Sequence, residues 1–139
     1  MPRFTVAILV LFFWGCSEPI SKDDLHYLNG YWQIVNVEFE NGANKEYSLG
    51  NTVDFFYLKD NKGYRKKVQP NIVGGFETSN NVVNFKIKEA NNDIMLWYEN
   101  GLSNWSVRLV ELKKDSFTII NEERTKYIYK RYKPIILNE

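Results

Sequence analysis

Residues 82–88 read VVNFKIK, and this stretch shows the pattern that decides the fold. Val83, Phe85 and Ile87 alternate with polar residues, so in an extended chain these three side chains point to the same side. Residues 105–109, WSVRL, repeat the alternation. Both stretches are therefore predicted to be β-strands with one buried face and one solvated face.

Similar runs, rich in Val, Ile, Phe, Tyr and Thr, follow one another from Tyr31 onward without a convincing helical period. The predicted strands cover residues 31–39, 52–59, 63–69, 72–78, 82–88, 93–99, 105–112, 116–122 and 125–133. Turn-forming residues separate these runs, as in Gly74-Gly75 and Asn80-Asn81. Eight or nine short strands in an open sheet would leave long edges exposed, so the pattern predicts either a closed barrel or two packed sheets.

A short helix is predicted before the strands, between about residues 22 and 29. Ser21 followed by Asp24 has the spacing of a capping box, and Leu25 and Leu28 give the segment an apolar side. Gly30 then favours the end of the helix.

The first fifteen residues have the pattern of a signal peptide. Arg3 begins the segment, and an apolar run follows from Phe4 to Trp14. As a helix this run would reach about 16 Å, whereas the hydrocarbon core of a bilayer measures about 30 Å. Residues 1–15 are therefore interpreted as a signal peptide and not as a membrane span.

Cys16 is the only cysteine of the chain, so it has no partner for a disulfide bond. Residues 13–16, FWGC, resemble the bacterial lipobox, and this resemblance implies that Cys16 is lipidated and becomes the first residue of the mature protein. Residues 16–21 would then be a lipidated tether, and residues 22–139 the folded domain. An ordinary signal peptide with an incidental thiol is the alternative. Because Ser17 follows the cysteine, the resemblance implies the outer membrane and leaves its periplasmic or surface face open.

Charge and composition exclude several classes of function. The chain has 18 Lys+Arg against 17 Asp+Glu, with one Cys and one His. This balance argues against a nucleic-acid partner, and a Cys/His zinc cluster is excluded. His26 is interpreted as a surface residue, and residues 64–67, YRKK, as solvated cations on an edge strand. No enzyme, metal or cofactor is expected, and the domain is expected to be a monomer.

Residues 28–32, LNGYW, lead into the first predicted strand. The Gly-x-Trp sequence at this place, after a helical turn and before a series of strands, resembles the lipocalin superfamily. The whole chain is similar to lipocalin-like lipoproteins of the Bacteroidetes type. This resemblance implies a small antiparallel up-and-down β-barrel. It also implies that Gly30 and Trp32 form one barrel end, with Arg131, or secondly Lys133, packed over the Trp32 indole.

The aromatic side chains suggest two functions. In the first, the barrel binds a small apolar or amphipathic molecule in a cavity, and the candidate lining residues are Phe55, Phe85, Trp97 and Trp105. In the second, the barrel is filled, and the protein is a non-enzymatic interaction module of the cell envelope. Glycan contact through exposed Trp and Tyr is a weaker third hypothesis.

Overall fold

The computed structural model describes residues 19–46, 53–71 and 73–133. The predicted signal peptide, Cys16 and residues 134–139 lie outside this part of the chain. Within it, no helix is long and apolar enough to cross a membrane.

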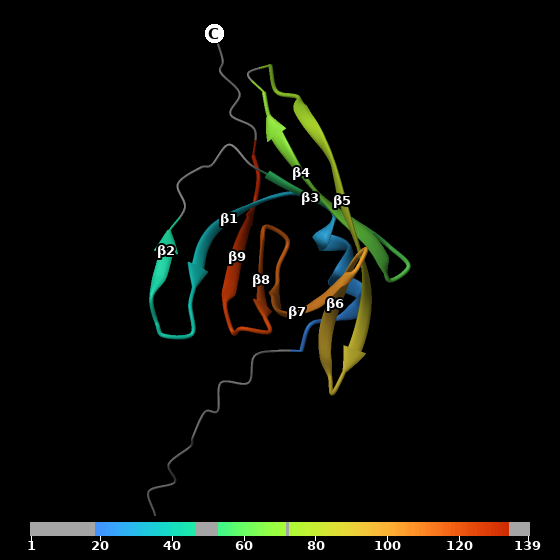
Figure 1. Cartoon of the computed structure of the whole chain (residues 1–139), viewed down its shortest axis with the longest axis vertical. Coiled ribbons are helices and arrows are strands. Elements are labelled where there is room, and N and C mark those ends of the chain that lie inside the picture. The colour runs from blue at the N-terminus through green and yellow to red at the C-terminus, as the bar shows by residue number, and fades with distance from the viewer. Residues whose placement is uncertain (1–18, 47–52, 72, 134–139) are drawn as a thin grey trace, which may run out of the picture.

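The described residues form one short helix and nine strands (Figure 1). They are η1 (Lys22–Leu28), β1 (Gly30–Glu38), β2 (Asn44–Glu46), β3 (Val53–Lys59), β4 (Lys62–Pro70), β5 (Phe76–Ala90), β6 (Asp93–Asn100), β7 (Ser103–Leu112), β8 (Ser116–Asn121) and β9 (Lys126–Arg131). From β3 to β9 each strand pairs antiparallel with the next, and β1 pairs with both β3 and β9. The predicted all-β, up-and-down barrel is therefore confirmed as a ring of eight strands, to which β2 is added at one side.

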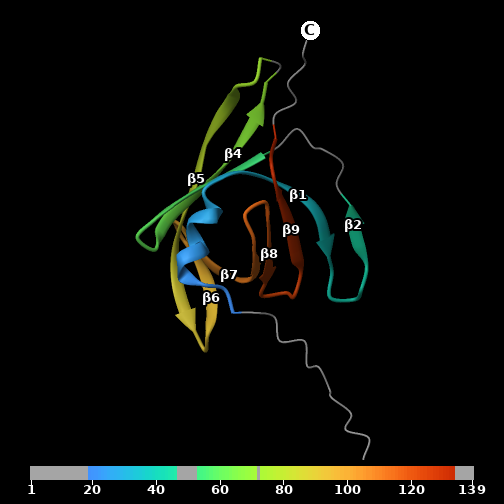
Figure 2. The ribbon, with the colours of Figure 1, turned by 180° about the vertical axis from the view of Figure 1, so that it is seen from behind.

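The sequence predicted two strands, at residues 72–78 and 82–88. This prediction is wrong, because the structure has the single strand β5 in their place. Lys66 pairs with Val82 and Val68 pairs with Thr78, so one residue of β4 faces three of β5. Residues 79–81 are thus accommodated in a bulge, where the sequence predicted a turn. The long hairpin of β4 and β5 extends beyond the other strands (Figures 1 and 2).

Strand β2 was not predicted from the sequence. Its three residues are all exposed and polar, so they carry no alternation of apolar and polar side chains. Backbone pairing holds the strand instead, since Asn36 to Glu38 of β1 pair with Glu46 to Asn44.

Helix η1 confirms the predicted helical segment, as a 3-10 helix. The Ser21 side chain accepts a hydrogen bond from the backbone N–H of Asp23, one residue earlier than a capping box requires. Leu25 and Leu28 are buried, and η1 packs against β3 and β7 before the chain enters β1 (Figure 2). The helix therefore covers one end of the barrel.

The core lies inside the ring of strands, where alternate residues of each strand meet. Its buried members come from η1 and from every strand of the ring except β4. They are Leu25, Leu28, Trp32, Phe56, Phe85, Ile94, Leu96, Tyr98, Val107, Leu109, Phe117, Ile119 and Tyr129. Strand β4 places Gly63 and Arg65 opposite the inward-facing Phe85 and Phe56.

Candidate ligand-binding site in the barrel interior

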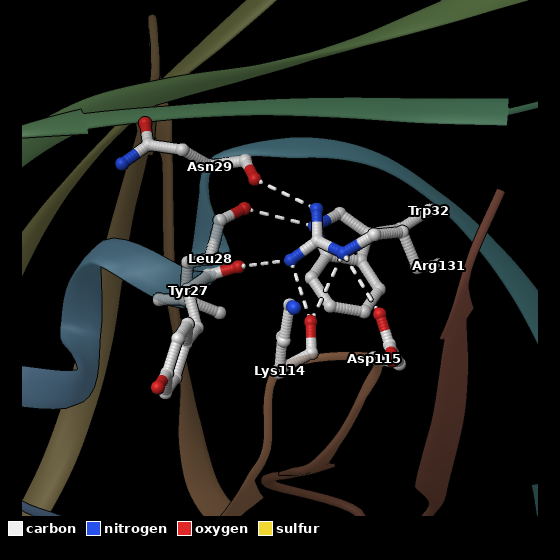
Figure 3. A network of polar contacts seen from close by, with 7 residues as sticks. All are labelled: Tyr27, Leu28, Asn29, Trp32, Lys114, Asp115 and Arg131. Atoms are coloured by element: carbon white, nitrogen blue, oxygen red, sulfur yellow. Dashed lines mark hydrogen bonds and ion pairs between the residues drawn. The ribbon is translucent and has the colours of Figure 1, made fainter.

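The end of the barrel that η1 covers is built around Trp32, whose side chain is fully buried. The indole Nε1 donates a hydrogen bond to the backbone carbonyl of Leu28 at 2.8 Å. The edge of Phe117 meets the indole with the ring centroids 4.7 Å apart. The Arg131 guanidinium lies over the indole, with its Cζ 4.1 Å from the ring centroid (Figure 3). Such a contact stabilises a partly desolvated cation.

Arg131 also connects three segments of the chain through backbone carbonyls (Figure 3). Its Nη1 donates to Asn29 at 3.0 Å, and its Nη2 donates to Tyr27 at 2.8 Å and Lys114 at 2.7 Å. The Asp115 carboxylate lies 3.6 Å from its Nε. Arg131 therefore ties the end of η1 to the β7–β8 turn, and this end of the barrel is closed by packed side chains.

Gly30 lies directly under this guanidinium. Its φ of +122° is a conformation that residues with a side chain rarely adopt. A Cβ at this position would lie 2.6 Å from Nη1 of Arg131. The lipocalin resemblance implied that Gly30, Trp32 and Arg131 lie at one barrel end. In the structure these three residues lie together at the end that η1 covers.

The four candidate lining residues separate into two pairs. Phe85 and Trp105 face the interior, where both of their rings contact the ring of Tyr98. Phe55 and Trp97 face outward, because the inward positions of their strands are taken by Phe56 and by Leu96 and Tyr98. The prediction that Phe55 and Trp97 line a cavity inside the barrel is therefore wrong.

Both outward rings have their own partners. Phe55 packs on Tyr31 with a centroid distance of 4.8 Å, and the Lys88 ammonium lies 4.6 Å from the centroid of Trp97. Runs of consecutive aromatic residues hid this alternation in the sequence, because FFY and LWY place apolar rings on both faces of a strand.

Above the closed end, several inward-facing apolar side chains are only partly buried. They pack on the core and remain accessible: Ile34, Val83, Trp105 and Tyr127. Arg65, on the neighbouring strand, is also partly exposed. Leu58, Ile87 and Leu112, at the end that η1 covers, are also partly buried. We call the half of the barrel away from η1 the open half.

Polar side chains lie between the core and the open half. Asp54 of β3 is 7% exposed and Tyr98 of β6 is 1% exposed. The Cζ of Arg65, from β4, lies 5.1 Å from the Tyr98 ring centroid. Tyr129 of β9 completes the group, because its hydroxyl interacts with both Asp54 and Arg65. We call these four residues the polar cluster.

Burial dominates the electrostatics of the polar cluster. Desolvation raises the pKa of the Asp54 carboxyl, although the positive charges of Arg65 and Lys67 and the Tyr129 hydroxyl oppose this rise. Desolvation likewise raises the pKa of Tyr98 to about 12 and the pKa of Tyr129 well above its usual value. Both phenols are therefore neutral hydrogen-bonding groups at physiological pH.

Sequence reasoning missed the polar cluster. Arg65 was interpreted as a cation on a solvated edge strand. Strand β4 is not an edge strand, because it pairs with a neighbour on each side, and the Arg65 side chain points inward. Asp54 gave a usable signal, because it is a lone carboxylate in the apolar run VDFFYL.

Other parts of the surface offer less chemistry. A pocket of about 170 Å³ on the outer face of β4 to β6 is lined in part by Trp97 and Lys86. A larger one, about 300 Å³, lies where Pro19 and Ile20 meet β6 and β7. His26 is exposed, and its Nδ1 lies 2.7 Å from the carbonyl of Asp23. Among the described residues, no group of three or more His, Cys, Asp or Glu could hold a metal ion.

A single closed antiparallel barrel, with a tryptophan and an arginine at its covered end, defines a lipocalin-like protein. The chain belongs to the lipocalin-like domain family, whose sequence model matches residues 28–119. A comparison with curated proteins finds no match.

A comparison with solved structures finds likenesses at low sequence identity. A lipocalin-like protein from Bacteroides uniformis is 12% identical, with a TM-score of 0.48, over 76% of this chain and 99% of that one. An uncharacterized protein from Bacteroides eggerthii gives 14% identity and a TM-score of 0.48 over the same shares of the two chains. Lobster apocrustacyanin A1 gives 13% identity and a TM-score of 0.46, over 83% of this chain and 66% of that one.

Proposed function

We propose that this protein is a lipid-anchored lipocalin-like lipoprotein that binds a small apolar or amphipathic molecule in the open half of its barrel. One observation carries the proposal: in the open half, partly exposed apolar side chains such as Trp105 and Val83 lie beside buried polar atoms of Asp54 and Tyr98. Trp32, at the other end, is fully buried among apolar side chains. A ligand entering this half would meet apolar walls first and a small number of polar groups below them. That distribution is typical of sites for small molecules.

The binding role is proposed in place of an enzymatic one. The closely spaced polar groups of the interior are a carboxylate, a guanidinium and two phenols whose pKa values are raised by burial. Such phenols donate hydrogen bonds well but are poor bases at neutral pH. The polar cluster is therefore suited to holding a ligand.

The interior site is tested by a pair of adjacent substitutions on β5. Val83→Trp would place an indole in the open half, whereas Val82→Trp would place it on the outer face, where Val82 is 45% exposed. We expect tryptophan fluorescence of the wild type and of Val82→Trp to change on titration with amphipathic molecules such as monododecanoylglycerol. The Val83→Trp variant should lose this response while keeping a cooperative melting transition. Equal responses in all three proteins would contradict an interior site.

The membrane anchor is a separate proposal, and it rests on the sequence around Cys16. Acyl chains stabilise membrane association by about 0.8 kcal/mol per buried methylene, so two or three chains would hold a domain of this size. Growth with a radioactive fatty acid should label the wild type and leave Cys16→Ser unlabelled. Equal labelling of both would overturn this part of the proposal.

The alternative function, an interaction module of the cell envelope, has one observation in its favour. A group of rings lies outside the barrel, where Tyr31 stacks on Phe76 at 4.1 Å and packs on Phe55. Tyr64 and Tyr132 extend this group to either side. These rings also hold the β4–β5 hairpin against β1, so their packing has a structural explanation as well. A protein that binds none of the amphipathic molecules above would favour this alternative.

A further inference from the structure

We propose that the polar end of the ligand is uncharged and carries a hydroxyl group, which binds between Asp54 and Tyr98. This inference rests on the proposed function, because it names the chemistry of the molecule that the open half would hold. It follows from which atoms of the polar cluster have hydrogen-bond partners and which atoms lack them.

Two buried atoms of the polar cluster lack hydrogen-bond partners within the described structure. They are the Asp54 Oδ1, which can only accept while the carboxyl is ionised, and the Tyr98 hydroxyl, which donates and accepts. Leaving such groups unpaired costs free energy, so native proteins seldom bury them without a partner. Both belong to side chains that are more than nine-tenths buried and face the barrel interior.

Their surroundings place these atoms at the floor of the open half. The Tyr98 ring stacks on the partly exposed Trp105 with a centroid distance of 5.3 Å and an interplanar angle of 10°. Arg65, also partly exposed, reaches over the other residues of the cluster from β4. A molecule that lies along Trp105 would therefore bring its lower end to Tyr98 and Asp54.

The charges around the cluster disfavour a ligand with a charge of either sign. Asp54 from β3 and Arg65 from β4 carry opposite charges, whereas β6 and β9 contribute the neutral phenols of Tyr98 and Tyr129. Lys67 adds a positive charge, but it is exposed and therefore screened by solvent. A carboxylate ligand would bring a second anion beside Asp54, and an ammonium ligand a second cation beside Arg65.

A hydroxyl group offers both kinds of hydrogen bond that these two atoms lack. It donates its hydrogen to the Asp54 Oδ1 and accepts a hydrogen from the Tyr98 hydroxyl, and it adds no charge. An aldehyde or an ether could accept from Tyr98 but would leave Asp54 unpaired. Fatty alcohols and monoacylglycerols have the required polar end together with an apolar chain.

The test compares ligands that share one alkyl chain and differ at the polar end. Dissociation constants for dodecanol, dodecanoate and dodecylammonium are measured at neutral pH with the wild-type protein. Each probe is kept below the concentration at which it forms micelles or separates from solution. We expect dodecanol to bind roughly ten-fold or more tightly than either ion, because an unpaired or like charge at a buried site costs at least that much. Equal affinities, or tightest binding of an ion, would overturn the inference.

Two variants then test the residues. Asp54→Asn removes the negative charge but keeps the shape, so Arg65 is no longer offset, and dodecanoate should gain affinity relative to dodecanol. Tyr98→Phe should weaken dodecanol binding several-fold, since it removes the hydroxyl that would donate to the ligand, while the protein keeps a cooperative melting transition. Tyr57→Phe is the control, because Tyr57 is 41% exposed on the outer face, and this variant should leave all affinities unchanged.

The outcomes separate this inference from the proposed function. If none of the three probes binds, the proposed interior site fails and this inference fails with it. If dodecanol and the two ions bind equally, or if Tyr98→Phe binds dodecanol as the wild type does, the open half still binds ligands but the hydroxyl assignment is wrong. The wild-type comparison decides the matter even if a variant does not fold.

Discussion

At the scale of single residues, Arg131 and Trp32 make the closed end of the barrel one unit. The indole is held on one side by η1 through the Leu28 carbonyl and covered on another by the Arg131 guanidinium. Each residue therefore supports contacts of the other, so their substitutions should not be additive.

Trp32→Ala should lower the free energy of unfolding by about 3–5 kcal/mol, the usual cost of removing a large buried aromatic side chain. Arg131→Ala should cost less, up to about 2 kcal/mol for the contact with the indole plus the loss of hydrogen bonds to three carbonyls. Urea unfolding of the two variants and of the double variant measures both values and their coupling. A Trp32→Ala protein with the wild-type midpoint would contradict the closed end described above.

Gly30→Ala provides a sharper test of the same contact. The new Cβ would meet the Arg131 guanidinium and would also strain the backbone, whereas Gly42→Ala, at a φ of +87°, would strain the backbone alone. Gly30→Ala should therefore be the more destabilising variant, by about 1 kcal/mol or more beyond Gly42→Ala. Thermal unfolding followed by circular dichroism compares them, and equal losses would argue against the close approach of Arg131.

The buried phenol of Tyr98 predicts how stability depends on alkaline pH. Its pKa is raised by burial from 10.0 to about 12, so the folded state holds this proton more tightly than the unfolded state does. The stability is complete below pH 10 and falls as the pH rises from 10 towards 12, by about 2–3 kcal/mol in total. Tyr98→Phe should reduce this fall, which urea unfolding at several pH values would detect. Superimposable pH profiles of variant and wild type would contradict the burial of this hydroxyl.

At the scale of elements, η1 closes one end of the barrel in addition to preceding β1 in the chain. Its Leu28 is fully buried, and Asn29, which follows it, exchanges hydrogen bonds with both backbone groups of Leu58 in β3. The helix therefore contributes apolar burial to the closed end, and its C-cap residue adds side-chain hydrogen bonds to β3.

Leu28→Ala should lower the free energy of unfolding by about 2–5 kcal/mol and increase the hydrogen exchange of η1 amides before that of the strands. Leu102→Ala is the matched control, because Leu102 is fully exposed in the β6–β7 turn and its removal should change neither quantity. Unaltered exchange in η1 of the Leu28→Ala protein would show that the helix does not close this end of the barrel.

The elements also show how far the sequence alone predicts this fold. Alternation in residues 82–88 and 105–109 is enough to predict strands and their buried faces, and most other strands follow from turn residues. The bulge in β5 was not predicted, because Asn80-Asn81 forms a turn in many proteins and only the register with β4 excludes one here. The polar cluster was not predicted either, since Asp54, Arg65 and Tyr98 come together only when the ring of strands is formed.

At the scale of the whole molecule, the two halves of the barrel differ in a way that single residues do not reveal. The closed half contains the fully buried Trp32, Leu28 and Phe117, and their apolar burial provides stability. The open half has partly exposed apolar walls above polar atoms that lack partners. Such atoms reduce stability, and the proposed ligand would complete their hydrogen bonds.

The position of the three described tryptophans allows a direct test of the proposed interior site. Trp32 lies in the closed end, Trp105 in the open half, and Trp97 on the outer face. Labelling the protein with fluorotryptophan and recording ¹⁹F NMR spectra during titration with dodecanol would report on these places separately. Binding in the open half predicts that the Trp105 resonance shifts to saturation while the Trp97 resonance stays in place. A shift of Trp97 without Trp105, or no shift of either, would contradict the central claim.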